Sequence, residues 1–453
     1  MMKKWVATLI ALSTSGMVSL PVLSDTMTLD QCLETAFQKN LGLASKQLSS
    51  QGKRSTANAA LLGMLPSLSM SASASDTVYN SVGGSKPDSY SSSLTLSQTV
   101  YQGNYLWSNW KKAELAKDQA DLETVRQGRQ LTQEIKAAWY AYLESIHKHK
   151  EAIEALERLK QHEKNAVAFY QEGRYWRNEV LQAQVEVARG EQKLIEAENT
   201  RTLARSTLNQ LLRRPLNTEL EPLGELAWTP MIWTDLDEAN DFALENRSDL
   251  HKSKLNKRIG KLTEQTTAYS YYPKVTLSSS MTMSADNLSH EDSTTTGKVM
   301  LSASWTPWEW GKTGEELAAA RQTTESYNLA YDELVESVML EVQKAFLTAV
   351  EADKKVKVLK KALEQSVENY RVNQVRYREQ LGTATDVLDA QDLLTSTRND
   401  YIGALSSYLT ALASMDLAVG QKSGADALIK NTEVEQEGLI GGLKKIVEPL
   451  GSE

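Results

Sequence analysis

Residues 66–76 read PSLSMSASASD. From Leu68 to Ser75 an apolar residue alternates with a serine, which is the two-residue period of a β-strand with one apolar and one polar face. In a soluble β-sandwich the apolar face would carry large residues that fill a core, and the polar face would carry Lys, Glu and Thr. Here the residues of both faces are small and the polar face is nearly all serine. The stretch therefore predicts a strand that does not cover an ordinary core.

The start of the chain predicts export from the cytoplasm. Residues 1–24 carry two lysines before an apolar stretch from Trp5, and Val22 and Ser24 suit the positions before a signal-peptidase cleavage site. The mature protein is then expected to begin near Asp25, and an N-terminal membrane anchor is the alternative. No later run approaches the roughly 18 apolar residues of a membrane-spanning helix, so strands would have to make any membrane crossing.

Composition and charge exclude some classes of function. The net charge of −8 argues against nucleic acid as a partner. Cys32 is the only cysteine, so the chain holds no internal disulfide, and the sequence before it is not a lipidation motif. With 41% apolar and 24% charged residues, the chain suits long solvated helices as well as compact domains.

The chain is predicted to be a tandem repeat. Residues 29–48, LDQCLETAFQKNLGLASKQL, match residues 236–255, LDEANDFALENRSDLHKSKL, at an offset of 207 residues. Pro66 falls on Pro273 at the same offset, and YQEGRYWRNEVLQAQ from Tyr170 falls on YREQLGTATDVLDAQ from Tyr377. The predicted organisation is a signal peptide (1–24), a first repeat (25–212), a linker (213–235), a second repeat (236–420) and a C-terminal tail (421–453).

Each repeat is predicted to contain a helix, a β-hairpin, a long helix and a final helix. In the first repeat these are residues 29–62, the hairpin 66–101 with strands 66–79 and 91–101, the long helix 104–168 and the helix 178–212. In the second repeat they are a helix from 236, the hairpin 273–308 with strands 273–285 and 298–308, the long helix 313–375 and the helix 384–419. A long helix of about 63 residues would span roughly 95 Å, which is too long for a compact core.

The small residues of the strands predict how many chains assemble. Four strands cannot close a barrel, and open strand edges are not tolerated in lipid, so several chains must share one barrel. Eight strands would need bulky side chains inside, whereas twelve strands from three chains enclose a water-filled bore that serines can line. The positions predicted to face lipid are Leu68, Met70, Val275, Leu277, Met281 and Met283.

Aromatic residues gather where the predicted strands meet the helices. They are Tyr101, Trp107, Trp110, Tyr271, Tyr272, Trp305, Trp308 and Trp310. Tyr and Trp are enriched at the two surfaces of a membrane, so these residues are interpreted as an interfacial girdle. The alternative is that they are packing residues at the joins.

Together these features resemble the TolC-type family of outer-membrane efflux and secretion channels. The resemblance covers residues 28 to about 420 and rests on the duplication, the prolines before each hairpin, the joins SQTVYQG (97–103) and SWTPWEWG (304–311), and TDVLDAQ (385–391). It implies a mainly α fold with transmembrane β, in which a homotrimer forms a 12-stranded barrel in the outer membrane of a Gram-negative cell. A 12-helix tunnel continues across the periplasm, where a periplasmic adaptor protein and an inner-membrane pump dock. The implied function is a passive exit duct of a tripartite efflux pump or type I secretion system.

The resemblance also implies a gate at the periplasmic end of the tunnel. The implied gate positions are Tyr377, Arg378, Asp386 and Asp389 in the second repeat, and Asn178 and Glu179 in the first. Gly382 stands where the family usually has a gate arginine, so either Arg378 replaces that arginine or the gate is held more loosely. In a trimer, Asp386 and Asp389 would form a ring of six carboxylates that attracts cations and raises some of its own pKa values. The alternative is that they only favour the positive end of a helix dipole.

The adaptor is expected to dock on the turns at the tip of the tunnel, near Gly173 and Gly382. The family's short docking signature appears only in weakened form, as EGR at 172–174 and LGT at 381–383.

Catalytic and metal-binding readings are not supported by the sequence. WGKT at 310–313 lacks the upstream glycine of a phosphate-binding loop, and HKHK at 147–150 is interpreted as a solvated helix face and not as a metal site. No enzyme activity and no cofactor are therefore expected. The competing interpretation is an exported periplasmic coiled-coil structural or adaptor protein, which would explain the long helices but not the serine-faced strands.

Overall fold

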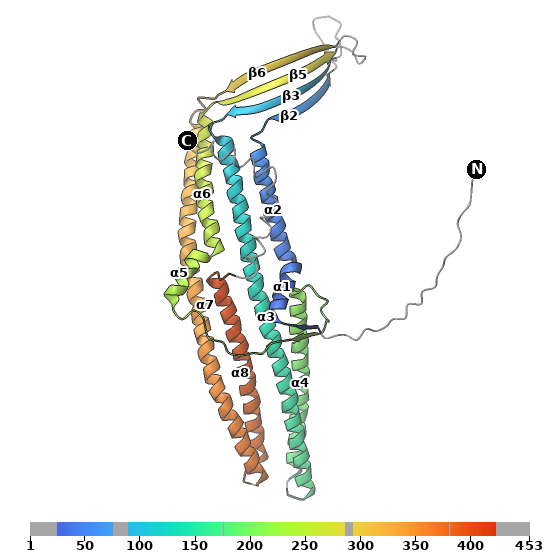
Figure 1. The fold of residues 1–453 in the computed structure, drawn as a ribbon. Coiled ribbons are helices and arrows are strands. Elements are labelled where there is room, and N and C mark those ends of the chain that lie inside the picture. The colour runs from blue at the N-terminus through green and yellow to red at the C-terminus, as the bar shows by residue number, and fades with distance from the viewer. Residues whose placement is uncertain (1–24, 76–88, 175, 286–292, 380, 423–453) are drawn as a thin grey trace, which may run out of the picture.

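The computed structural model describes residues 25–75, 89–174, 176–285, 293–379 and 381–422. The predicted signal peptide, the end of the strand predicted at 66–79 and nearly all of the predicted tail lie outside these ranges. The described chain is a long stalk of helices with a four-stranded sheet tilted across one end (Figure 1). None of the described helices is both long enough and apolar enough to span a membrane.

Apart from a short first strand in the first half and a 3₁₀ turn in the second, the two halves of the described chain contain the same order of elements. In the first half these are β1 (Asp25–Met27), α1 (Leu29–Lys39), α2 (Leu41–Leu62), β2 (Ser67–Ser75), β3 (Ser89–Tyr101), α3 (Tyr105–Gln171) and α4 (Arg177–Leu211). The linker holds β4 (Leu220–Pro222), which pairs in parallel with β1. In the second half they are α5 (Leu236–Asn246), α6 (Ser248–Ala268), the 3₁₀ turn Tyr269–Tyr271, β5 (Lys274–Ala285), β6 (Thr294–Ser304), α7 (Lys312–Arg378) and α8 (Ala384–Ala418).

The duplication read from the sequence extends to the packing of the core. One buried cluster holds Cys32, Ala36 and Leu43 against α3 and the end of α4. The other holds Ala239, Ala243 and Leu250, the residues 207 positions later, against α7 and the end of α8. The same shift carries Leu131 and Ile135 of the first cluster onto Val338 and Val342 of the second. The two repeats therefore bury equivalent side chains at the middle of the stalk.

The single helix predicted over 29–62 is wrong, because the chain breaks at Asn40. Asn40 is extended (φ −69°, ψ 121°), and its N–H donates to the Ala36 carbonyl while its side chain accepts from the Leu43 N–H at 3.0 Å. One asparagine thus ends α1 and caps α2. In the second repeat Arg247 (φ −74°, ψ 125°) separates α5 from α6 with the same backbone conformation, but its side chain does not cap α6.

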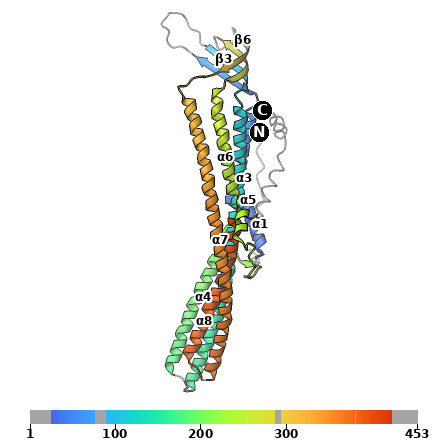
Figure 2. The same cartoon turned by 90° about the vertical axis from the view of Figure 1, so that its left-hand side faces the viewer.

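The stalk is one layer of helices around α3, which runs its whole length. Towards the sheet the neighbours follow the order α2, α3, α6, α7, and towards the other end the order is α4, α3, α8, α7 (Figures 1 and 2). The linker crosses the middle of this layer. It is held there by Tyr142, whose hydroxyl donates to the Leu220 carbonyl at 2.7 Å, and by Tyr408, whose hydroxyl donates to the Thr229 carbonyl at 2.6 Å.

The sheet has the order β2-β3-β5-β6, and all neighbours are antiparallel. The strand predicted at 298–308 lies four residues earlier, at Thr294–Ser304. Its last residue pairs with Lys274, where β5 begins, and Pro307 has no N–H with which to continue a ladder. At the other end Thr294 pairs with Ser284, so the run of threonines there belongs to the strand.

Candidate functional site

The turn between α7 and α8, at the end of the stalk far from the sheet, is built around a buried tyrosine. Tyr377 is 3% exposed, and it packs with Ala384 and Val387 of α8. Its ring centroid lies 5.5 Å from that of His162 and 6.1 Å from that of Phe169, both on α3. Burial also lowers the pKa of His162. Tyr377 therefore joins three helices at this tip.

The first turn of α8 is held by a capping box. The Thr383 N–H donates to Asp386 Oδ2 at 2.8 Å, and the Asp386 N–H donates to Thr383 Oγ1 at 3.2 Å. The hydrogen bonds from the Thr383 backbone and side chain, with a smaller contribution from Arg376, lower the pKa of Asp386. Asp389 lies one turn further along α8, and both carboxylates are exposed. Within one chain, Asp386 thus caps the first turn of α8, where a negative charge also favours the positive end of the helix dipole.

The two arginines near this turn have different partners. Arg378, the expected gate arginine, is exposed and donates to Gln374 Oε1 at 3.1 Å along its own helix. Arg376 crosses the turn and donates to the Leu381 carbonyl at 3.3 Å. A Cβ on Gly382 would lie 3.3 Å from Cβ of Arg376, so a glycine allows this close approach. Sequence reasoning did not single out Arg376.

The turn between α3 and α4 is closed by a glycine in a left-handed conformation. Gly173 has φ +72°, and the Arg174 N–H donates to the Phe169 carbonyl at 2.9 Å. α4 then begins without a side-chain cap, because its N-cap residue is Trp176, which is 83% exposed. Asn178 is exposed and Glu179 is half-buried in the first turn of α4. The predicted tip residues of the two repeats thus lie at the same end of the stalk (Figure 1).

A buried ion-pair cluster holds α3 to α8 above the tips. The Glu151 carboxylate is 2% exposed and accepts from Arg158 at 2.6 Å and from Arg398 of α8 at 2.5 Å. Arg398 also contacts Glu154 at 3.2 Å. A buried charge is tolerated only with such partners, and this cluster links α3 to α8 directly. No sequence signal pointed to it, because Glu151 and Arg398 are 247 residues apart.

The aromatic residues lie at the junction of the sheet and the stalk. Trp308 and Trp310 are 70% and 89% exposed and pack edge to face at 6.1 Å. Trp305 is also exposed, and its indole N–H donates to the Tyr271 carbonyl at 3.1 Å. Tyr101, Tyr271 and Tyr272 are exposed, and Trp107 is half-buried. Trp110 is only 1% exposed, so for this residue the packing alternative is correct.

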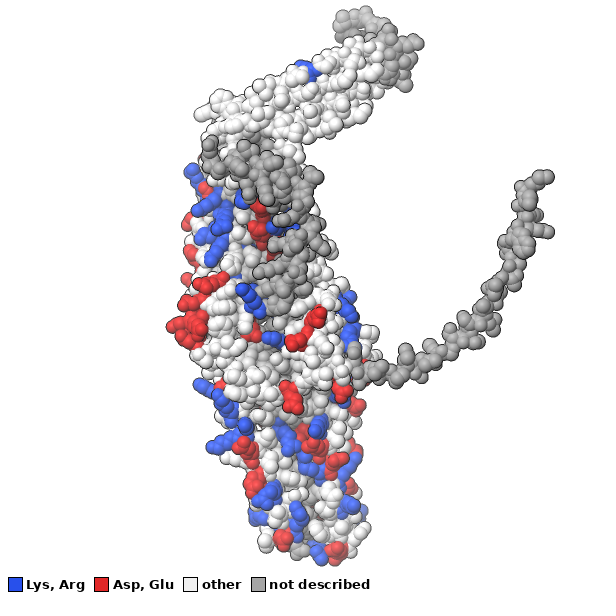
Figure 3. Space-filling view, viewed as in Figure 1, with Lys and Arg blue, Asp and Glu red and all other residues white. Residues whose placement is uncertain are grey.

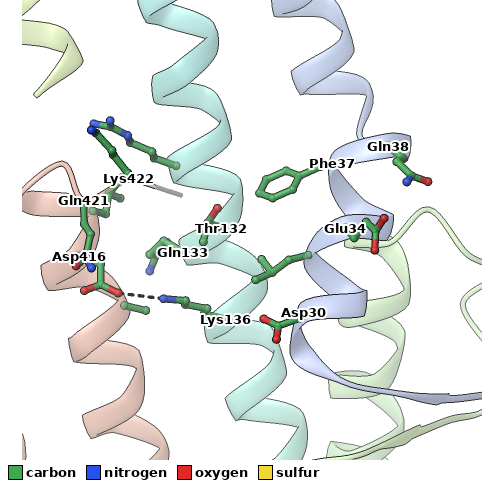
Figure 4. A pocket seen from close by; sticks show the side chains of 14 residues that line it. Asp30, Glu34, Phe37, Gln38, Thr132, Gln133, Lys136, Asp416, Gln421 and Lys422 are labelled. Atoms are coloured by element: carbon green, nitrogen blue, oxygen red, sulfur yellow. Dashed lines mark hydrogen bonds and ion pairs between the residues drawn. The ribbon is translucent and has the colours of Figure 1, made fainter. Parts of the chain in front are cut away.

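A pocket of about 470 Å³ opens at the middle of the stalk between α1, α3 and the end of α8 (Figure 4). Phe37 and Leu33 give it an apolar wall, and Lys136 pairs with Asp416 across it at 3.0 Å. Nowhere in the described part of the chain do three or more His, Cys, Asp or Glu side chains come together as a metal site.

Comparison with known proteins gives one family. The family described as outer membrane efflux protein matches residues 32–213 and 241–421. No curated protein sequence matches the chain.

Several solved structures have the same fold. The outer membrane protein VceC of Vibrio cholerae is 17% identical, with a TM-score of 0.75, over 86% of this chain and 96% of that one. The outer membrane channel CmeC of Campylobacter jejuni is 14% identical, with a TM-score of 0.76, over 89% and 88%. The outer membrane channel MtrE of Neisseria gonorrhoeae, in its open state, is 20% identical, with a TM-score of 0.76, over 86% and 88%.

Proposed function

The chain belongs to the outer membrane efflux protein family, and we propose that it is the passive exit duct of a tripartite efflux pump or of a type I secretion system, gated at its periplasmic end. As a member of this family it is an outer-membrane protein that extends into the periplasm of a Gram-negative cell. Its relatives are channels and not enzymes. The specific transport system and the gate are the proposed part.

The observation that carries the proposal concerns the edges of the sheet and of the helix layer. Each has two edges with no neighbour among the described residues, and these edges lie on the same two sides of the chain. In the sheet, β2 and β6 each have one unpaired side. In the stalk, α2 and α4 form one edge and α7 forms the other. α2 leads directly into β2, and β6 leads directly into α7 (Figure 1). A neighbouring copy that pairs with one strand edge would therefore also meet the helix edge below it.

The helices at these edges carry exposed apolar side chains, which supports their being covered by further copies. On α7 these include Leu329 (64%), Leu347 (54%) and Val358 (67%), and on α2 and α4 they include Leu48 (67%), Ile195 (60%) and Leu203 (69%). Because strand edges are not tolerated in lipid, the copies must close into a ring. Three copies give twelve strands and suit the small hydroxyl residues of one face.

In the proposed trimer the tips of the stalk form the gate. Asp386 and Asp389 would ring the axis, with Asn178 and Glu179 beside them. Tyr377 and Arg378 would hold neighbouring helices closed. The exposure of both aspartates supports this assignment, and Asp386 can cap α8 and still present a carboxylate to the axis.

The two ends of the duct would meet different partners. The turns at Gly173 and Gly382 are the proposed docking points for the periplasmic adaptor, and the inner-membrane pump would supply the energy. At the other end, the exposed Trp305, Trp308 and Trp310 are proposed to lie at the membrane surface, where amphipathic aromatic rings are favoured.

Fractionation and single-channel recording test the proposal. The full chain should be recovered from membranes only with detergent, should be trimeric by mass in detergent, and should conduct ions after insertion into a planar bilayer. Recovery as a soluble monomer from the periplasm would refute the duct and would support the exported coiled-coil protein. If the chain does form a conducting trimer, deletion of its gene distinguishes the two transport systems, because it should abolish either drug export or protein export.

A further inference from the structure

The strand register sorts the residues of the sheet onto two chemically different faces. Ser69, Thr95, Ser280 and Lys298 lie in one row across the four strands. On this face every position of β2, and every position of β3 from Ser89 to the bulge after Thr99, is Ser or Thr. The opposite face carries nearly all of the apolar residues, among them Met70, Leu94 and Met281 in neighbouring positions, and Met300 of β6 is the exception that lies on the Ser- and Thr-rich face. We refer to the Ser- and Thr-rich side as the hydroxyl face.

The only charged residues of the four described strands are two lysines, and both lie on the hydroxyl face. Lys298 is opposite Ser280 in the middle of β6, and Lys274 is opposite Ser304 at the start of β5. Both side chains are exposed, and neither takes part in an ion pair with a described residue. Figure 3 shows the contrast, since the sheet is almost free of charge whereas the stalk carries both signs.

These lysines have uncharged neighbours on this face, which are Ser280, Thr296 and Met300 around Lys298, and Thr276 and Ser304 around Lys274. Hydroxyl pairs such as Ser73 with Ser91, at 2.8 Å, bind each other on this face. A hydroxyl group can donate a hydrogen bond to an anion but cannot neutralise an ammonium group. The positive charge is therefore available to a solute that passes along this face. A passage with low-dielectric walls strengthens the field of such charges.

We propose that Lys298 and Lys274, which are six residues apart in register along β5, form an extended cationic site in the bore of the sheet region, and that this site attracts anionic groups of the transported solutes. The proposal rests on the proposed function, because the hydroxyl face must line the bore of a closed ring. Three copies would then place six ammonium groups along the bore. The site has the opposite charge to Asp386 and Asp389 at the far end of the stalk.

The test is a polyanion block of the purified trimer in a planar bilayer. Tripolyphosphate is added from the extracellular side, with the bilayer made of zwitterionic phosphatidylcholine so that the lipid presents no net charge. The wild type should be blocked in 0.1 M KCl and much less in 1 M KCl, because the screening length falls from about 10 Å to about 3 Å. In the double variant Lys274→Ser, Lys298→Ser, half-block should need an about tenfold higher concentration. Lys53→Ser, which removes an exposed lysine of α2, should leave the block unchanged.

Charge reversal sharpens the same experiment. Lys298→Glu should abolish the block by tripolyphosphate and shift the reversal potential towards cation selectivity. Equal block of the wild type and the double variant, or no block of a conducting wild type, would overturn the proposal and leave the duct itself intact. The latter result is also expected if the lysines face lipid. If the wild type forms no conducting trimer, the proposed function fails first and the cationic site fails with it.

Discussion

The two tips of the stalk are copies of one sequence unit, yet their side chains differ in position and role. Tyr377 is buried in the second repeat, whereas the aligned Tyr170 of the first is 45% exposed. Thr383 caps α8, whereas the aligned Trp176 is 83% exposed and caps nothing. The turns themselves agree, because Leu381 N–H donates to Arg376 O at 2.8 Å as Arg174 N–H does to Phe169 O.

After the duplication, the two tips therefore kept the same backbone turn but carry different side chains. The second repeat supplies an anchored helix end with acidic groups. The first supplies an exposed aromatic residue between two arginines, Arg174 and Arg177. A ring of three chains would thus alternate two kinds of tip, and each of the following experiments changes one tip and uses the aligned residue of the other as its control.

The largest effect is expected from the two tyrosines. Tyr377→Ala removes a buried aromatic ring and should cost about 3 kcal/mol of local stability, whereas Tyr170→Ala should cost less than about 0.5 kcal/mol. Hydrogen exchange at the last turns of α7 and of α3 measures both. Similar losses of protection in the two variants would mean that the tips are not held differently.

The acidic groups come next. The double change Asp386→Asn, Asp389→Asn should weaken block by a multivalent cation, added from the periplasmic side, by at least about tenfold, or about 1.4 kcal/mol. The amide introduced at position 386 keeps an oxygen that can accept from the Thr383 N–H, so α8 should stay capped. Glu179→Gln is the matched change in the first repeat and should have little effect. A strong effect of Glu179→Gln alone would show that the ring of carboxylates is formed by α4 and not by α8.

The N-terminal caps of α8 and α4 can be exchanged by removing the cap of α8 and adding one to α4. Thr383→Ala should destabilise the start of α8 by about 1 kcal/mol, because its side chain accepts a hydrogen bond from an otherwise unpaired N–H. Trp176→Thr should give α4 the missing cap and stabilise its first turn by a similar amount. Exchange rates at these two helix starts measure the changes. Faster exchange in α4 after Trp176→Thr would show that the indole contributes more to that turn than a cap does.

The smallest effect is a pH dependence that only the tip of the second repeat should show. Burial lowers the pKa of His162 below its unfolded value of about 6.5. The unfolded state therefore binds the proton first, so the stabilising contact with Tyr377 is fully present above about pH 6.5 and weakens as the pH falls below it. Exchange at the end of α7 should accelerate as the pH falls below about 6.5, after correction for the intrinsic rate. His162→Asn, which introduces the residue found at the aligned position 369, should remove this dependence.

The sequence predicted the architecture well because the architecture repeats. The shift of 207 residues could be found without any structure, and the core pairs such as Leu43 and Leu250 follow it. The two faces of the strands were also predictable, since alternation needs only a local pattern. The break at Asn40 was missed because the residues on each side keep a helical pattern and only the cap geometry separates them.

The candidate site was less predictable because it depends on contacts between distant segments. The Thr-x-x-Asp pattern from Thr383 to Asp386 is a local signal of the capping box, and it could have been read. The packing of Tyr377 on His162, and the pairing of Glu151 with Arg398, depend on how α3 lies against α7 and α8. Such contacts join residues that are far apart in the chain, so the local hydrophobic pattern of the sequence does not predict them.

The interruptions at Asn40 and Arg247 also have a mechanical consequence. Each 67-residue helix, α3 or α7, is unbroken and about 100 Å long. Beside them, α1 meets α2 at Asn40 and α5 meets α6 at Arg247. A continuous helix resists bending along its whole length, whereas two helices that meet at a break can bend at that break. The two breaks are equivalent positions of the duplicated unit, 207 residues apart, so we expect the stalk to bend more easily there than elsewhere. A load applied at the tips would then be absorbed at mid-height and would leave the hydrogen-bonded strands unstrained.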